Sequence, residues 1–160
     1  VIRVRPVTIN PERLKQFEAH LMLFFTGFSR NASDIAAHQI AETPNKKPEL
    51  TAMCQSVSEG LKILNSNADL VEFGKLLHEN WLLKRSLTDK ISTTTIDEIY
   101  EAALEAGALG GKLLGAGGGG FMLIFAKPDV QPNIKEKLKK ILHVPFQLEN
   151  LGSQIIFYSP

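Results

Sequence analysis

Hydrophobic and polar residues follow two different periods along the chain, and each period predicts one kind of secondary structure. Six segments combine apolar residues at the spacing of a helix face with residues that favour helix ends, such as Asn10-Pro11 before the first segment. These predicted helices cover residues 11–18, 32–40, 48–65, 95–107 and 134–143, and a further one begins near residue 68, contains Trp81 and ends near Lys84 and Arg85. Shorter apolar runs predict strands at residues 1–9, 20–26, 121–127, 146–148 and 154–158.

The helical spacing also predicts which side chains face the core. In the long helix at 48–65 these are Leu50, Met53, Cys54, Val57, Leu61 and Leu64. In the other helices they include Ala32, Ile35, Ala36, Ile40, Leu70, Phe73, Leu77, Trp81, Ile134, Leu138, Ile141 and Leu142. Cys54 and Trp81 are therefore interpreted as core residues. Thr95 to Glu98 fits a capping box, so the helix at 95–107 is expected to begin there and to end at Gly107.

The order of these elements is strand, helix, strand, four helices, strand, helix and a final strand or strand pair. That order predicts an α+β fold in which helices cover a four-stranded antiparallel sheet. It corresponds to a ferredoxin-like split β-α-β sandwich with helices inserted between its two halves. The chain opens on Val1 rather than Met, so we expect a single domain over residues 1–160 that belongs to a longer protein.

Composition narrows the range of functions without choosing among them. Apolar residues make up 44% of the chain and charged residues 22%, as in ordinary globular domains. Lys and Arg number 18 against 17 Asp and Glu, and this balance argues against a nucleic-acid binder. A single cysteine excludes internal disulfides and a Cys-based zinc cluster. No apolar run reaches the roughly 18 residues that span a bilayer, so we expect a cytoplasmic protein without a membrane segment.

The strongest candidate for a ligand site is the run Gly115-Ala116-Gly117-Gly118-Gly119-Gly120. Glycine loses the most backbone entropy on folding, so such a run is an unfavourable way to build a plain loop. It is useful where backbone N–H groups must approach a ligand, because successive N–H groups form a concavity that binds anions. A flexible linker or a tight helix-to-strand turn is the structural alternative.

Two familiar glycine motifs do not fit this run. Gly115, Gly117 and Gly120 have the spacing of a dinucleotide fingerprint, which requires a strand before it and a helix after it. Here we predict the reverse, a helix before the glycines and a strand after them. A Walker A loop needs Gly-Lys followed by Ser or Thr, and Gly111-Lys112 is followed by Leu113. The remaining hypothesis is a phosphate-binding glycine turn from helix to strand.

The segment Thr26-Gly27-Phe28-Ser29-Arg30 is a second candidate. It leaves a buried strand and enters a helix, whose N-terminus favours anions. Arg30 is unfavourable in the first helical turn unless an anion lies nearby, and the hydroxyls of Thr26 and Ser29 could hydrogen-bond a polyol. Routine helix capping with a solvated arginine is the alternative.

Lys84 and Arg85 form a third candidate, at the end of the helix that contains Trp81. Two cations suit the dipole at a helix C-terminus, and they could also contact a substrate phosphate. A solvated helix end is the alternative. The four histidines show no metal-ligand spacing, so no metal site is expected within the chain, and His20 is interpreted as structural.

Residues 107–121, Gly-Ala-Leu-Gly-Gly-Lys-Leu-Leu-Gly-Ala-Gly-Gly-Gly-Gly-Phe, resemble the third, C-terminal motif of the GHMP small-molecule kinases. Residues 26–30 and 81–89 resemble the sugar-phosphorylating branch of that family. The resemblance extends over nearly the whole chain and implies the ferredoxin-like C-terminal domain of a two-domain kinase. The other domain of these kinases carries the phosphate-binding loop Pro-x-x-x-Gly-Leu-x-Ser-Ser-Ala and an acidic catalytic residue, and residues 1–160 contain no such loop.

The reaction that the resemblance implies is transfer of the γ-phosphoryl group of ATP, accompanied by Mg²⁺, to a hydroxyl of D-glycero-D-manno-heptose 7-phosphate or a related sugar. Residues 115–120 would then bind the substrate or the γ-phosphate, with Thr26, Gly27, Ser29, Arg30, Lys84 and Arg85 around the sugar-phosphate pocket. The catalytic residues would lie on the N-terminal domain, so we expect the fragment alone to be inactive. The alternatives are a stand-alone ligand-binding or regulatory module, and another enzyme of the family, either a fucokinase- or galactokinase-like protein or a decarboxylase.

Overall fold

The computed structural model describes residues 7–27 and 32–149, together with residues 152, 155 and 157. Its elements are α1 (Pro11–Ala19), β1 (Leu21–Phe25), α2 (Ala32–Glu42), the short 3-10 helix η1 (Thr43–Asn45), α3 (Lys47–Leu64), α4 (Leu70–Arg85), α5 (Thr94–Glu105), β2 (Gly110–Leu113), β3 (Phe121–Phe125), α6 (Gln131–Lys137) and β4 (Leu142–His143). The strands form one antiparallel sheet in the order β2-β3-β1-β4. This is the strand order of a ferredoxin-like sandwich with helices α2 to α5 inserted after β1, so the predicted fold class is confirmed.

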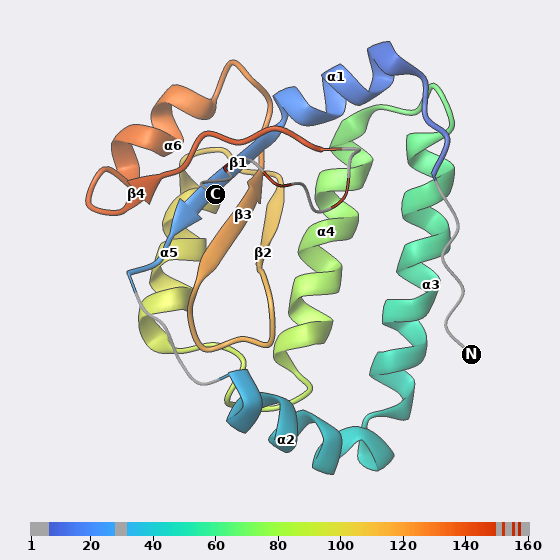
Figure 1. Ribbon diagram of the computed structural model, residues 1–160, viewed down its shortest axis with the longest axis vertical. Coiled ribbons are helices and arrows are strands. Elements are labelled where there is room, and N and C mark those ends of the chain that lie inside the picture. Colours follow the sequence, from blue (N-terminus) through green and yellow to red (C-terminus); the bar gives the residue numbers. More distant parts are fainter. Residues whose placement is uncertain (1–6, 28–31, 150–151, 153–154, 156, 158–160) are drawn as a thin grey trace.

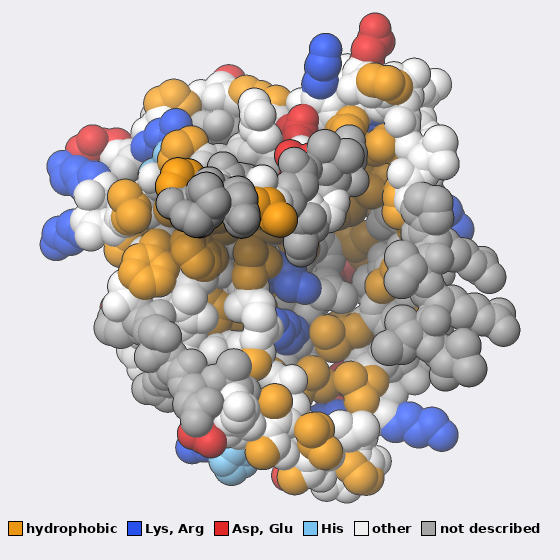
Figure 2. Space-filling view, in the orientation of Figure 1, with side chains coloured by type: hydrophobic (Ala, Val, Ile, Leu, Met, Phe, Trp, Pro, Cys, Tyr) orange, Lys and Arg blue, Asp and Glu red, His pale blue; other side chains and the backbone are white. Residues whose placement is uncertain are grey.

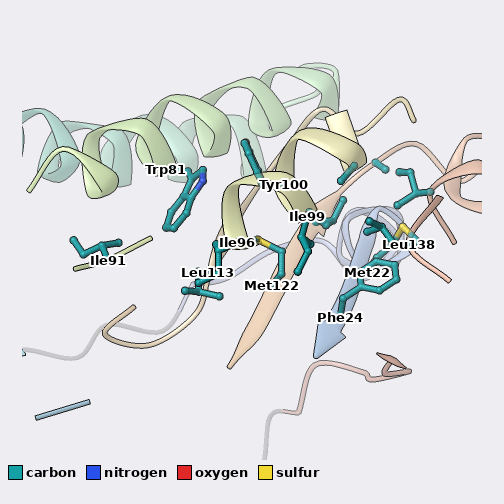
Figure 3. Close-up of a cluster of buried hydrophobic side chains, with 14 of the residues drawn as sticks. Met22, Phe24, Trp81, Ile91, Ile96, Ile99, Tyr100, Leu113, Met122 and Leu138 are labelled. Carbon is teal, nitrogen blue, oxygen red and sulfur yellow. The ribbon is translucent and has the colours of Figure 1, made fainter. Parts of the chain in front are cut away.

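One face of the sheet packs against α5 and α6 and forms the main core. Side chains alternate across a strand, so Met22 and Phe24 of β1 point to the same face as Met122 of β3, and all three are buried. The helix residues in this core include Ile96, Ile99, Tyr100, Ala103, Ile134 and Leu138. Figure 3 shows Leu113 of β2 and Met122 lying close to Ile96 and Ile99 of α5. Burying each such side chain contributes roughly 1.5–3 kcal/mol.

The other face of the sheet is partly covered by α4, and α3 packs on the outer side of α4 (Figure 1). Helix α4 comes so close to β2 that a Cβ atom on Gly110 would collide with the Gly74 carbonyl oxygen and the His78 backbone. Phe17, Phe73 and Phe125 form an aromatic cluster at the end of this interface, with ring centroids 4.9 to 5.6 Å apart. The approach of α4 to β2 brings the end of α4 next to the glycine run.

The predicted helices are confirmed, but two of them have different ends. The N-cap of α5 is Thr93, two residues before the predicted cap at Thr95, because the Thr93 hydroxyl accepts a hydrogen bond from the Ile96 N–H. Helix α6 ends at Lys137, and residues 142–143, predicted as its last turn, form β4 instead. Pairing with the free edge of β1 outweighs the helical spacing there, and it leaves Leu142 exposed rather than buried.

Strand β2 was not predicted, because Gly110 and Gly111 lower the strand propensity of this short segment. Among the described residues the sheet has four strands, the expected number, and two of them, β2 and β4, lie outside the predicted strands. Residues 7–9 and 146–148 are not in strands. The rest of the first predicted strand, residues 1–6, and most of the last one, 154–158, lie outside the described residues.

Five side chains that the helical spacing predicts to be in the core are exposed, and they include Leu142, described above, and Leu61. Ile40 is 72% exposed, Val57 is 63% exposed, and Cys54 is also exposed. On α3 the reason is that α4 is its main neighbour, so the buried strip of α3 is narrow and centres on Gly60 and Ile63. The remaining apolar residues of α3 line an open groove of about 250 Å³ beside α4. Within the described ranges, no helix combines the length and hydropathy of a membrane-spanning segment.

Candidate functional site

The glycine run connects two strands rather than a helix and a strand. It joins β2 to β3, and the Leu114 N–H donates to the Phe121 carbonyl oxygen at 2.8 Å at the base of the loop. The predicted helix-to-strand turn is therefore wrong, although the dinucleotide fingerprint still fails because no helix follows the loop. The backbone has positive φ at Gly115 and Gly117, 76° and 125°, so an L side chain would be strained there. In Figure 1 the loop lies beside α2 and the C-terminal end of α4.

Side chains from three other elements hold the carbonyl groups of the loop. The Lys84 ammonium group donates to the Leu113 and Gly115 carbonyl oxygens at 3.1 and 2.7 Å. Gln39 of α2 donates to the Ala116 carbonyl oxygen at 2.7 Å. At the far side of the loop, the N–H and the hydroxyl of Thr26 both donate to the Gly120 carbonyl oxygen, each at 2.9 Å. The carbonyl side of the loop is thus anchored at its start and at its end.

The amide side of the loop is mostly free. Within the described part of the chain, five loop N–H groups donate to no intramolecular acceptor, those of Gly115, Ala116, Gly117, Gly119 and Gly120. The Gly118 N–H is the exception, since it donates to the Ile91 carbonyl oxygen at 2.8 Å. A run of unpaired N–H donors on a braced loop is the arrangement that binds anions such as phosphate.

Close packing against the turn at Ile91 sets the path of the loop. A Cβ atom on Gly117 would lie 2.8 Å from both the Cα and the carbonyl oxygen of Ile91. The Ile91 side chain is fully buried near Trp81, so this wall of the loop belongs to the core (Figure 3). The glycine at position 117 is therefore required both by its backbone angle and by a steric contact.

Lys84 is the most strongly perturbed basic group near the loop. The residue is 9% exposed, and its ammonium group lies 6.0 Å from the centroid of the Trp81 ring. Burial, and to a lesser degree the charge of Lys112, lower the pKa of Lys84 from 10.5 to about 8. The group is still mainly protonated at neutral pH, and two of its three N–H donors are used by the loop.

Arg85 has a structural partner. Its guanidinium group donates to the Asp97 carboxylate at 2.8 Å, and the Ser92 hydroxyl donates to the other oxygen of the same carboxylate at 2.5 Å. Asp97 lies in the first turn of α5, where a negative charge is favourable. These contacts join the end of α4 to the start of α5 and hold the intervening segment, which includes Ile91.

The remaining predicted site residues are placed as follows. Gly27 has φ of 81° and open space around it, at the end of β1 next to Thr26. Ser29 and Arg30 lie outside the described residues. Among the described residues, no group of three His, Cys, Asp or Glu side chains is arranged to hold a metal ion. His20 stacks on Phe125 and contacts the Gln16 carbonyl oxygen, in agreement with its structural interpretation.

Two residues near the loop were not singled out from the sequence. Gln39 gave no signal, because a single polar residue in a helix does not indicate its partner. Lys112 is part of the glycine motif and lies three residues before Gly115, which could have identified it. Its pKa is lowered by burial, and no ion pair to a described carboxylate compensates its charge.

Comparison with known proteins identifies the family. Residues 61–144, more than half of the chain and the part that includes α4, α5 and the glycine loop, match the family described as GHMP kinases C terminal. The chain belongs to this family. It therefore has the C-terminal domain of the GHMP kinases, as the glycine motif implied.

Several curated relatives are similar to the chain. It is 32% identical over 141 residues to D-glycero-alpha-D-manno-heptose 7-phosphate kinase of Campylobacter jejuni, covering 84% of this chain and 41% of that protein. It is 33% identical over 133 residues to mevalonate kinase of Thermococcus onnurineus, covering 78% and 39% respectively. It is 27% identical to the bifunctional fucokinase/GDP-fucose pyrophosphorylase of Arabidopsis thaliana, covering 92% of this chain and 14% of that protein. The chain therefore spans about two fifths of the length of the first and second of these relatives.

Solved structures show the same fold. The mevalonate kinase of Methanococcus jannaschii superposes with a TM-score of 0.71 at 24% identity, covering 86% of this chain and 42% of that one. At this level of identity the likeness concerns the fold alone.

Proposed function

We propose that this chain is the C-terminal half of a kinase that transfers the γ-phosphoryl group of ATP to a hydroxyl of a sugar phosphate, with D-glycero-D-manno-heptose 7-phosphate as the first substrate to test. The observation that carries the proposal is the loop of residues 115–120, in which the carbonyl groups of Gly115, Ala116 and Gly120 are held by side chains and five amides have no partner among the described residues. The choice of substrate rests on the 32% identity to the heptose 7-phosphate kinase.

Phosphoryl transfer depends mainly on positioning and on stabilising the charge that spreads over the phosphoryl oxygens. Free N–H groups on a rigid loop meet both needs, because they need no reorganisation when the charge develops. Lys84, Gln39 and Thr26 are positioning residues in this proposal, since each holds a loop carbonyl and so directs the neighbouring amides.

The nucleotide and its metal fit this chain to different degrees. The loop amides match the phosphate groups of ATP. The described residues offer no set of side chains that would hold Mg²⁺, so we assign no metal ligand to this chain. The activation of the sugar hydroxyl is assigned to the N-terminal domain, which this proposal expects in the full-length protein.

Mevalonate is the second candidate substrate, because the mevalonate kinase of Thermococcus onnurineus is 33% identical to the chain. It differs from a sugar phosphate in carrying a carboxylate and no phosphate. A substrate panel therefore separates the two assignments.

The test uses the full-length protein that contains this chain, supplied with ATP, Mg²⁺ and one acceptor at a time: heptose 7-phosphate, fucose, galactose or mevalonate. Release of ADP with heptose 7-phosphate above the other acceptors supports the proposal, and release only with another acceptor refutes the sugar-phosphate assignment. Gly117→Ala should lower kcat/KM at least about 10-fold, because the new Cβ forces the loop away from Ile91. Gly152→Ala is the matched control, since its Cβ would meet no atom within 4 Å.

A further inference from the structure

Lys112 is a partly buried cation without a partner. It lies on β2 opposite Leu123 of β3, on the same face of the sheet as Gly110, which is the face that α4 approaches. Its ammonium group forms no hydrogen bond or ion pair in the described part of the chain. Burial disfavours the charged form of Lys112 and lowers its pKa. An unpaired ammonium in such a position is unfavourable unless a group other than the described residues compensates it.

A second cation lies close to Lys112. The charge of Lys112 contributes to the lowered pKa of Lys84, which reaches the loop from α4. Neither lysine is paired with a carboxylate of the described residues. Figure 2 shows basic side chains in the hollow where β2 and α4 meet. Both charges on this side of the molecule favour an anion. So do the free hydrogen-bond donors, which include the third N–H of Lys84 and the loop amides.

The spacing along β2 separates this position from the glycine loop. Lys112 precedes Gly115 by three residues, which corresponds to about 10 Å of extended chain. This distance is comparable to the length of a seven-carbon sugar. The Lys112 side chain therefore starts on β2 and outside the loop, so the anionic group that it binds need not be the phosphoryl group that is transferred at the loop.

We propose that Lys112 binds the phosphate monoester that the acceptor sugar already carries and so makes the enzyme specific for a phosphorylated sugar. This assignment rests on the proposed function, because it presumes a sugar-phosphate acceptor. The ligand chemistry, a phosphate monoester or a polyphosphate, could also come from ATP, and the experiment separates these two sources.

The experiment compares Lys112→Met, which keeps the length of the side chain and removes its charge, with Lys112→Arg, which keeps the charge. Lys127→Met is the matched control, because Lys127 is exposed and forms no ion pair to a described residue. All variants are made in the full-length protein, and far-UV circular dichroism compares their folding with that of the wild type. Lys112→Met should raise the KM for heptose 7-phosphate at least 10-fold and leave the KM for ATP within twofold. Lys112→Arg should restore most of the loss, and Lys127→Met should match the wild type.

Two results would overturn the proposal. An increase in the KM for ATP in place of that for the sugar phosphate would assign Lys112 to the nucleotide. If the KM for ATP and the KM for the sugar phosphate both stay unchanged, Lys112 is a hydrated lysine that packs on the sheet and binds neither ligand.

A binding measurement keeps this test independent of turnover. Inorganic phosphate is titrated into the wild type and Lys112→Met, and its affinity is followed by ³¹P NMR. A loss of at least 10-fold in Lys112→Met supports the anion site even if no sugar is phosphorylated, in which case only the proposed function has failed. Equal affinities refute the anion site whatever the substrate panel shows.

Discussion

Replacing Lys84 by methionine tests whether Lys84 is a buried charged group whose hydrogen bonds hold the loop. Lys84→Met retains an unbranched side chain against Trp81 but removes the ammonium group that donates to the Leu113 and Gly115 carbonyl oxygens. Two opposing effects follow for stability at neutral pH. Two hydrogen bonds from a charged donor, each worth roughly 1.5–3 kcal/mol, are lost. The unfavourable burial of the charge is relieved at the same time.

The lowered pKa of Lys84 sets the size and the sign of a pH dependence. The pKa is about 8 in the folded chain and close to 10.5 in the unfolded chain. Between these values the unfolded chain binds more protons, so the folded wild type gains stability as the pH rises. Each pKa unit corresponds to about 1.4 kcal/mol, which gives a full effect of about 3 kcal/mol. Most of it, about 2–3 kcal/mol, should appear between pH 7.5 and pH 10.

The assay is urea unfolding of the 160-residue chain, followed by far-UV circular dichroism across this pH range for the wild type and Lys84→Met. Other groups titrate equally in both proteins, so the difference between their free energies of unfolding isolates Lys84. That difference should move in favour of the wild type by about 2–3 kcal/mol as the pH rises. Lys127→Met, at an exposed position, should show no such trend. A difference that stays constant with pH would refute the idea that Lys84 is held as a desolvated cation.

Three further predictions concern packing, electrostatics and the division of the reaction between domains. Gly60→Ala should stabilise α3 by about 0.5–1 kcal/mol, because the added Cβ would make ordinary contacts. Gly74→Ala should destabilise the chain by about 1–3 kcal/mol, because the added Cβ would lie 2.5 Å from the Leu109 Cβ. Urea midpoints of the two variants that moved in the same direction would contradict this prediction. Asp97→Asn should lower stability by about 1 kcal/mol at low salt and by less in 1 M NaCl, and an effect independent of salt would argue against an ionic role for the pair with Arg85. The isolated chain, folded by circular dichroism, should release no ADP from ATP and heptose 7-phosphate, and sugar-dependent release would place catalysis within these 160 residues.

The helices and the fold class follow from local patterns, and the errors fall where local patterns are weakest. The stripe of Ile96, Ile99, Tyr100 and Ala103 on α5 has one buried face, so its spacing predicts its packing. On α3 the same kind of stripe includes Val57 and is exposed there, because α4, the main neighbour of α3, covers only one side of it. A periodic pattern states which residues can share a face, but the number of partners decides how much of that face is buried.

Strands β2 and β4 illustrate a different limit. Their sequences, Gly-Gly-Lys-Leu and Leu-His, have no strand pattern of their own, and they become strands because β3 and β1 offer free edges. Strand propensity depends on the neighbouring strand more than on the residue itself. For the same reason the prediction of a helix directly before the glycine run was wrong. Strand β2 precedes the run, and the loop connects the two strands of a hairpin.

For the candidate site too, some features follow from the sequence and others only from the tertiary structure. The sequence by itself determined that a run of glycines with a high entropic cost of folding lies at residues 115–120. It also determined that Lys84 lies at the end of a helix that contains Trp81, since both features are properties of neighbouring residues. Only the tertiary structure decided which groups of that loop are free. Lys84, Gln39 and Thr26 come from segments 31 to 94 residues away along the chain, and they occupy three of the loop's carbonyl groups, whereas five of its amides have no partner among the described residues. Such contacts depend on how α2, α4 and β1 converge in space, and no short stretch of sequence contains that information.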